Sequence, residues 1–473
     1  MWFGFLAMSA NYFWLMALQL LYATVTSRML SPSDFGSYAV ALAGVAIMGV
    51  VGGSTLELAA ARREHDSPSL DRALVSMAGI IGCAALALAV LLSGPWAHLW
   101  GIPDSQDITI ALAIGLPFSA LQGVFAGVLR RRGMTSSVAR LTAIAQSAAV
   151  VVGLVSVAWT RSDWTLAVSP VLGSAVSAVA LSLRAPRDRR MPGLPSVQSW
   201  ADLTFAMRSA GMNVLRSSVR TSSTWSIGKA CGSATLGSFN RALTLVTVPL
   251  ESLQRALVYA VFPELRPAGP IVRSAHAFTE LMIIVTGPAI IIAGLGVFAA
   301  PEFIALVLGP TWEEAASLAG LATLLGVIPM ISAPMGTALE AQARFRSTLV
   351  AWIVSAMAII GGVLLTLRSG SPVPAMSGLV VGGLASIPSL AAPLVRSGLL
   401  NLRGWWNGVS RILATQAFFS VLMFLGLEVL PDQRPLRAGL VVAASVLEGA
   451  FLWLTRGKLG FVKVLQARLG LRL

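Results

Sequence analysis

Residues 73–93 read ALVSMAGIIGCAALALAVLLS, a run of 21 residues without a charged side chain. A helix of about 20 apolar residues spans the hydrocarbon layer of a bilayer, which is about 30 Å thick. This run therefore predicts a transmembrane helix, and the sequence contains 13 further segments of comparable length and character. We expect an all-α integral membrane protein with about 14 spans, at residues 2–27, 36–60, 73–93, 108–130, 137–159, 164–183, 202–228, 239–262, 276–300, 316–342, 347–367, 376–395, 412–430 and 438–455.

The composition excludes a water-soluble protein. Apolar residues make up 56% of the chain, charged residues make up 11%, and the mean hydropathy is +0.78, whereas a soluble domain carries about 25% charged residues. The net charge of +14 is confined largely to short loops, so we expect it to meet anionic lipid headgroups and expect no nucleic-acid partner. The two cysteines and three histidines stand singly along the chain, so we expect no metal site.

The 34 basic residues are distributed unequally between alternate loops. One side of the predicted membrane collects 23 Lys and Arg, the other side collects six, and five arginines fall inside spans. The positive-inside rule assigns the basic side to the cytoplasm, and an even number of spans then places both termini there. The tail 456–473 alternates basic and apolar residues, which predicts a short amphipathic helix on the cytoplasmic surface.

An internal repeat predicts the domain organisation. A shift of 201 residues lays Gly36 on Gly237 and Arg28 on Lys229. Six spans per copy is an even number, so the copies share one orientation, as in transporters built from parallel repeats around a central cavity. We predict an N-terminal six-helix bundle at 1–183, a cytoplasmic linker at 184–200, a second six-helix bundle at 201–396, two additional spans at 397–455 and the tail at 456–473.

Polar stripes follow one face of the first and seventh spans. In the seventh span Asn213, Arg216 and Arg220 recur every three or four residues and share a face. Each arginine opposes insertion by about 2.5–3.5 kcal/mol, so we interpret this face as the lining of a hydrated cationic cavity that binds a phosphate or carboxylate. The predicted substrate-binding residues are Arg216, Arg220, Asn213, Arg208, Arg28, Lys229, Arg241, Tyr12 and Gln19.

The same residues also have a purely structural interpretation. Buried carboxylates could neutralise the arginines, or the side chains could reach the membrane interface. Arg255 lies one turn after Glu251, so an intrahelical ion pair is an alternative for that arginine. Acids inside spans often carry the coupling ion of a transporter. We predict ion coupling at Glu251, with Glu57 and Glu340 as further candidates.

The segment SRMLSPSDFGSY at 27–38 resembles the first-loop signature of the bacterial oligosaccharide (polysaccharide) flippases, which belong to the multidrug/oligosaccharidyl-lipid/polysaccharide (MOP) exporter superfamily. The resemblance continues in GSFNRA at 237–242, VFPEL at 261–265 and LGPTWEEAA at 308–316. It implies two six-helix bundles, alternating access, and translocation of a polyprenyl-pyrophosphate-linked saccharide from the inner to the outer leaflet of the bacterial cytoplasmic (inner) membrane. Members often carry an acidic residue near the position of Ser223, which this chain lacks.

We therefore expect a flippase and not an enzyme, without a bound cofactor, driven by a transmembrane proton or sodium gradient. Its expected partners are the lipid-linked glycan, membrane lipids, and a glycan polymerase or glycosyltransferases. The first alternative is a flippase of the same superfamily for the lipid-linked peptidoglycan precursor. A drug exporter fits less well, because organic cations require an anionic or aromatic interior. A membrane protein that transports nothing would tolerate glutamine at both 216 and 220.

Overall fold

The computed structural model describes residues 2–61, 67–194, 197–261, 271–342, 344–429, 434–455 and 459–469, and the regular elements in these ranges are all helical. The first half of the chain contains α1 (Trp2–Met29), α2 (Pro32–Ala61), α3 (Pro68–Trp100), α4 (Ser105–Ala113), α5 (Gly115–Arg131), α6 (Thr135–Thr160), η1 (Asp163–Ala167), α7 (Val168–Arg184), η2 (Arg187–Arg189) and α8 (Val197–Cys231). The second half contains α9 (Ser233–Val261), α10 (Ile271–Leu308), η4 (Pro310–Trp312), α11 (Glu313–Ala341), α12 (Phe345–Ser369), α13 (Val373–Arg396), α14 (Leu402–Val429), α15 (Arg434–Leu454) and α16 (Gly460–Leu469).

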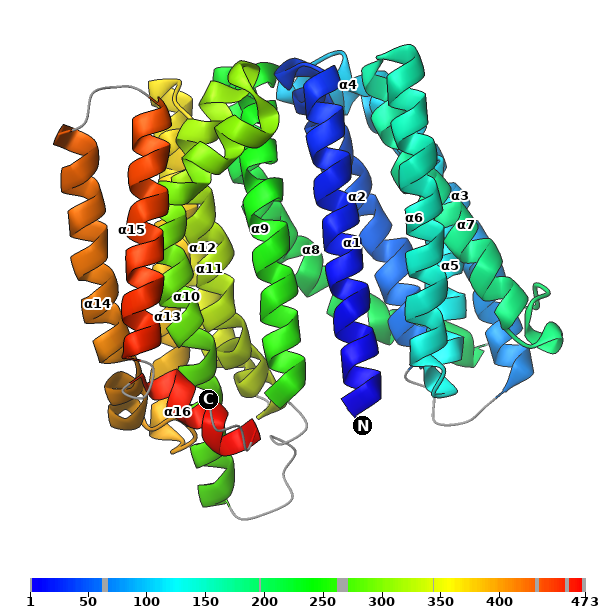
Figure 1. Ribbon diagram of the computed structural model, residues 1–473. Coiled ribbons are helices and arrows are strands. Elements are labelled where there is room, and N and C mark those ends of the chain that lie inside the picture. The colour runs from blue at the N-terminus through cyan, green and yellow to red at the C-terminus, as the bar shows by residue number, and fades with distance from the viewer. Residues whose placement is uncertain are drawn as a thin grey trace. The chain divides into compact units, whose positions relative to one another are not determined.

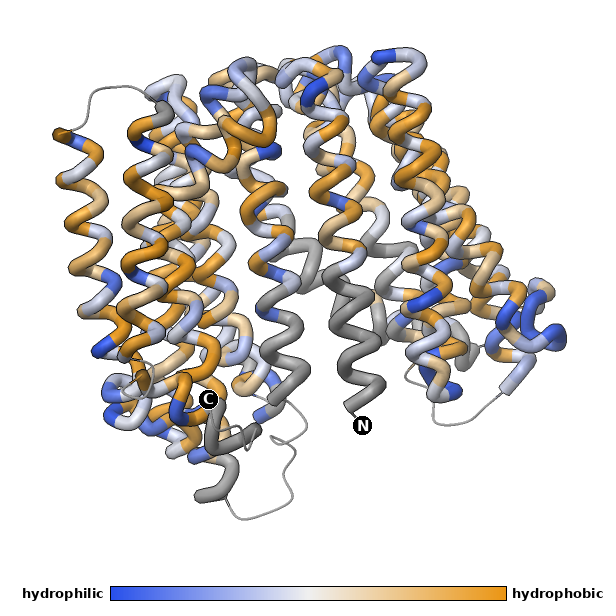
Figure 2. The backbone as a smooth tube through the Cα atoms, in the orientation of Figure 1, coloured by the Kyte–Doolittle hydropathy of each residue, from blue (hydrophilic) through white to orange (hydrophobic). Residues whose placement is uncertain are grey.

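Each predicted span coincides with one of these helices or with two of them in succession. The span 108–130 is divided into α4 and α5 at Ile114, and the span 164–183 combines η1 with α7. Ten of the helical segments in the described part of the chain are long and apolar enough to cross a membrane. Figure 2 shows apolar residues along α6, α7, α14 and α15 and hydrophilic residues gathered at helix ends. The prediction of an all-α, multi-pass membrane protein is confirmed.

The chain divides into two compact units. Unit 1 comprises Met1–Asn240 and Thr366–Pro372, and unit 2 comprises Arg241–Leu365 and Val373–Leu473. Within each unit, long helices run side by side (Figure 1). Helix α8 lies in unit 1, where it packs on α2 and α3. The domain boundaries inferred from the sequence follow the repeat instead of compactness, and they stay a prediction.

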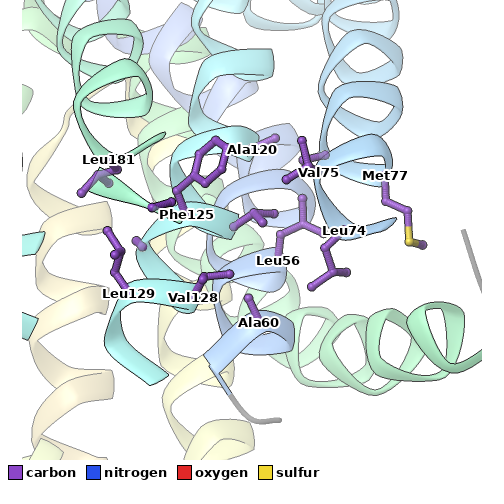
Figure 3. Close-up of a cluster of buried hydrophobic side chains, with 14 of the residues drawn as sticks. Leu56, Ala60, Leu74, Val75, Met77, Ala120, Phe125, Val128, Leu129 and Leu181 are labelled. Atoms are coloured by element: carbon purple, nitrogen blue, oxygen red, sulfur yellow. The ribbon is translucent and has the colours of Figure 1, made fainter. Parts of the chain in front are cut away.

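The core of unit 1 lies between α2, α3, α5 and α7. Its buried side chains include Leu56, Leu74, Phe125 and Leu181, one from each of these helices (Figure 3). Small residues let α2 and α5 approach closely: a β-carbon at Gly123 would overlap the backbone of α2. Close backbone contact of this kind is how helices associate in a bilayer, where burial of apolar surface from water no longer drives packing.

A buried ion cluster fixes the segment after α7 to unit 1. Asp71, in the first turn of α3, is fully buried, and its Oδ2 accepts hydrogen bonds from Arg131 at 2.7 Å and Arg189 at 2.6 Å. Gly193 donates its backbone N–H to the Arg72 carbonyl oxygen at 3.0 Å and to the Ser76 hydroxyl at 2.9 Å. The linker is therefore attached to the first turns of α3 as far as residue 193.

The core of unit 2 forms around α10, α11 and α13, with the buried side chains Met282, Met330 and Leu394 among its members. Helix α16 packs on α10 and α14 in the same unit. A β-carbon at Gly287 of α10 would lie 2.9 Å from the Phe461 ring, so glycine at this position makes room for the C-terminal helix. The short helix predicted for the tail is present at Gly460–Leu469.

Two helix-to-helix turns contact each other reciprocally within unit 1. A β-carbon at Gly36 would overlap the carbonyl oxygen of Ser233, and one at Gly237 would overlap the carbonyl oxygen of Pro32. Shifting Pro32 and Gly36 by 201 residues gives Ser233 and Gly237, so each contact maps onto the other. Reciprocal contacts are the property of a two-fold axis. The two turns therefore pair with approximate two-fold symmetry, in the register that the sequence repeat predicted.

Candidate functional site

The polar face of α8 changes from exposed to buried within one helical turn. Arg220 is exposed, whereas Ser223 and Ile227 are fully buried, although all three lie on one side of the helix at 100° per residue. Ser226 is also fully buried, and its hydroxyl donates to the Ser223 carbonyl oxygen at 2.8 Å. Arg220 therefore stands one turn before the point where this face of α8 enters the packed interior of unit 1.

The C-terminal turns of α8 are held against the end of α3. The indole N–H of Trp225 donates to the Leu99 carbonyl oxygen at 3.2 Å. A β-carbon at Gly228 would lie 3.1 Å from the Trp100 ring, so glycine permits this approach. Lys229 is exposed in the last turn of α8, and its Nζ lies beside Gly101, the residue that ends α3. A positive charge at this position also interacts favourably with the negative end of the helix dipole.

The other predicted binding residues with described side chains lie on α1 and α9. Arg28 is exposed in the last turn of α1. Lys229 has the same position in α8. Gln19 is exposed on α1. Arg241 is buried in α9, at the first residue of unit 2. The structure thus places exposed cations at equivalent ends of the two repeated helices α1 and α8.

Five side chains named in the sequence analysis lie outside the described residues, although their backbones belong to α1, α8 and α9. They are Tyr12, Arg208, Asn213, Arg216 and Arg255. Their contribution to a polar face stays a prediction.

The three acids predicted to couple an ion occupy different helices. Glu57 of α2 forms an ion pair with Arg130 of α5, and these side chains are 29% and 49% exposed. Glu251 on α9 and Glu340 on α11 are both exposed. The coupling role of each acid stays a prediction.

The buried polar pair Glu448 and Gln416 in unit 2 was not predicted from the sequence. Glu448 of α15 is fully buried, Gln416 of α14 is 5% exposed, and the Gln416 side-chain amide donates to Glu448 Oε2 at 3.4 Å. An acid inside an apolar span was visible in the sequence, but its partner lies 32 residues away on another helix. The pairing depends on packing that hydropathy does not predict.

Comparisons with known proteins agree with the fold and with the loop motifs. Residues 25–317, more than half of the chain, match the family described as polysaccharide biosynthesis protein. The teichuronic acid biosynthesis protein TuaB of Bacillus subtilis (strain 168) is 24% identical over 240 residues. The alignment covers 48% of this chain and 47% of TuaB, so the chain spans about half the length of this relative.

Two solved structures show the same architecture. The lipid II flippase MurJ in an inward closed conformation aligns with a TM-score of 0.73 at 10% identity, covering 94% of this chain and 98% of MurJ. An inward-facing multidrug resistance MATE family transporter of the MOP superfamily aligns with a TM-score of 0.61 at 15% identity, covering 81% and 95%. At these identities the likeness shows the fold. The resemblance read from the loop motifs is confirmed, and the chain belongs to the polysaccharide biosynthesis protein family, with the fold of the MOP superfamily.

Proposed function

We propose that this protein is a flippase that moves a polyprenyl-pyrophosphate-linked oligosaccharide from the inner to the outer leaflet of the bacterial cytoplasmic membrane by alternating access. The observation that carries the proposal is Arg220, an exposed cation in α8, the predicted seventh span, one turn before this face of the helix becomes fully buried. Family membership and the likeness of the fold to a lipid II flippase support a lipid-linked glycan as the cargo.

The chemistry of Arg220 suits a pyrophosphate. An arginine inside a span raises the free energy of insertion by about 2.5–3.5 kcal/mol, so a chain that retains it needs a polar or anionic group nearby. A guanidinium group donates paired N–H bonds to phosphate oxygens, and each charge-assisted bond contributes about 1.5–3 kcal/mol. Arg216 precedes Arg220 by one turn and would present a second guanidinium on the same face. Two such groups would hold a diphosphate at the end of the polar face.

The remaining expectations belong to the same proposal. A proton or sodium gradient would drive export, both termini would be cytoplasmic, and a glycan polymerase or glycosyltransferases would act on either side of the transport step. The distribution of basic residues supports this orientation.

Replacing both arginines tests the proposal. We expect Arg216→Gln with Arg220→Gln to reduce glycan export at least tenfold, which corresponds to a loss of about 1.4 kcal/mol or more. Surface glycan would be quantified in cells that lack other flippases, with immunoblotting to verify membrane insertion. Arg368→Gln is the matched control, because Arg368 is an exposed arginine in the last turn of α12. Export at the wild-type level by the double variant would overturn the proposal.

A flippase for the lipid-linked peptidoglycan precursor is the second candidate, because the fold aligns with lipid II flippase over 94% of this chain. Complementation separates the two cargoes. If the chain restores growth of cells depleted of their lipid II flippase, the peptidoglycan precursor is the cargo. If it restores only surface polysaccharide in a strain without its own polysaccharide flippase, the first proposal holds.

A further inference from the structure

The pair formed by Glu448 and Gln416 lies among three helices of unit 2. Glu448 belongs to α15, Gln416 to α14, and Gly294 of α10 faces the Gln416 side chain. A β-carbon at position 294 would overlap the Gln416 amide, so the absence of a side chain there leaves room for the polar pair. Glu448 is 0% exposed, although α14 and α15 present many of their apolar side chains outward.

Each partner of the pair has one oxygen atom without a donor. Glu448 Oε2 accepts the Gln416 amide N–H at 3.4 Å, while Glu448 Oε1 and Gln416 Oε1 are both buried and accept no hydrogen bond from the described residues. A carboxylate and an amide oxygen are acceptors, so neither can satisfy the other. Each of the two oxygen atoms therefore lacks a donor among the described residues.

No cation among the described residues pairs with Glu448. The charged residues nearest to the pair on the three helices are Arg411 on α14, Glu302 on α10 and Arg437 on α15. They are five, eight and eleven residues away along their own helices, or about 8, 12 and 16 Å along the axes at 1.5 Å per residue. Lys463 lies on α16, which packs on α10 near Gly287. An ionised carboxylate buried without a cation is far more costly than a neutral carboxyl.

We propose that Glu448 and Gln416 form a proton-binding site that loads and releases the coupling proton of the transport cycle. The proton bonds to Glu448 Oε1 and is donated to Gln416 Oε1, while the Gln416 N–H continues to donate to Glu448 Oε2. Binding converts a carboxylate into a carboxylic acid and neutralises the site. This one proton satisfies both orphaned oxygens and removes a charge from the apolar interior.

A proton fits the site better than a sodium ion. Hard cations take about six oxygen ligands, whereas this site offers two unpartnered oxygens on the described residues. The coupling role rests on the proposed transport function, but occupancy of the site by a proton does not. An experiment can therefore contradict the coupling role without contradicting the binding of a proton at the site.

Infrared spectroscopy of the full-length protein in lipid nanodiscs measures the proton directly. We expect a protonated-carboxyl C=O band at neutral pH that Glu448→Gln abolishes and Gln416→Met shifts to higher frequency, because the hydrogen-bonded partner is lost. The band should decrease when the pH is raised. Glu428→Gln is the matched control, since Glu428 is an exposed acid at the end of α14, and it should leave the band unchanged.

Two spectroscopic results would contradict the binding of a proton at Glu448. If Glu448→Gln removes no band, Glu448 is ionised, for example beside a buried water, and the proposal is overturned. Loss of the band on adding sodium at constant pH would assign the site to sodium instead of a proton.

Export tests the coupling step. We expect Glu448→Gln to remove the dependence of glycan export on the proton gradient, measured with and without a protonophore. If the wild type shows the band but Glu448→Gln retains gradient-dependent export, the pair is only a fixed structural contact and the proposal is overturned. Absence of export in the wild type, with the band present, would instead count against the flippase function alone.

Discussion

Two carboxyl groups among the described residues are fully buried, and the chain stabilises them by opposite means. Asp71 accepts hydrogen bonds from two arginines at 2.7 and 2.6 Å, one on α5 and one in η2. Glu448 has an amide partner at 3.4 Å and no cation among the residues that the structure describes. Asp71 lies in the first turn of α3, where a loop can supply arginine, whereas Glu448 is in the interior of α15, among apolar helices. Position along the helix therefore accounts for the arginine partners of Asp71 and for the amide partner of Glu448.

Removal of the paired acid should have the largest effect. We expect Asp71→Ala to lower the free energy of unfolding by about 3–5 kcal/mol, because the buried Arg189 and the nearly buried Arg131 lose their shared partner. Thermal or denaturant unfolding of the purified protein in detergent measures this change. Limited proteolysis should also cut the segment near Gly193, since the cluster attaches that segment to α3.

Glu57→Ala is the matched control for the paired acid. Glu57 and Arg130 are substantially exposed, so loss of their ion pair should cost about 1 kcal/mol or less. Equal losses for Asp71→Ala and Glu57→Ala would mean that burial of the cluster contributes nothing.

Crowding the neutral acid should have an intermediate effect. We expect Gly294→Ala to lower the free energy of unfolding by about 1–3 kcal/mol, because the new methyl group overlaps Gln416 and forces the pair apart. Gly361→Ala on α12 is the control: nothing lies within 4 Å of a β-carbon there, so alanine should be neutral or stabilise by about 0.5–1 kcal/mol. A stabilised Gly294→Ala variant would show that the Gln416 side chain has room to move.

The fold also shows which structural features hydropathy can predict and which it cannot. The positions of the helices along the chain were predictable, because most predicted spans are apolar runs long enough to cross a bilayer. The helix ends were not: the predicted span 73–93 is helical over Pro68–Trp100. Pro68 opens that helix, Gly101 closes it with a φ of 73°, and the Trp96 N–H donates to the Val40 carbonyl oxygen at 3.0 Å. These are capping and tertiary contacts, which a window of apolar residues does not contain.

The candidate site was predictable in part for the same reason. Periodicity placed Arg220 on a polar face, because residues three or four apart share one side of a helix. It could not show that the face becomes buried at Ser223, since that burial depends on α2 and α3. Nor could it find Gln416, whose neighbours in the sequence are apolar or small and whose partner is on another helix.

The smallest expected effect separates the neutral acid from the paired one most sharply. Glutamine at 448 keeps the shape and the hydrogen bonds of a protonated glutamate, so Glu448→Gln should change the free energy of unfolding at neutral pH by about 1 kcal/mol or less.

The pH dependence of the free energy of unfolding should differ between Glu448→Gln and the wild type. If the folded protein holds a proton on Glu448 that the unfolded chain releases above about pH 4.3, the folded state binds more protons, and stability falls as the pH rises. Unfolding measured from pH 5 to pH 9 should show this fall in the wild type and a flatter profile in Glu448→Gln. Identical profiles for wild type and Glu448→Gln would mean that the folded and unfolded states hold the same number of protons, which is incompatible with a neutral buried acid.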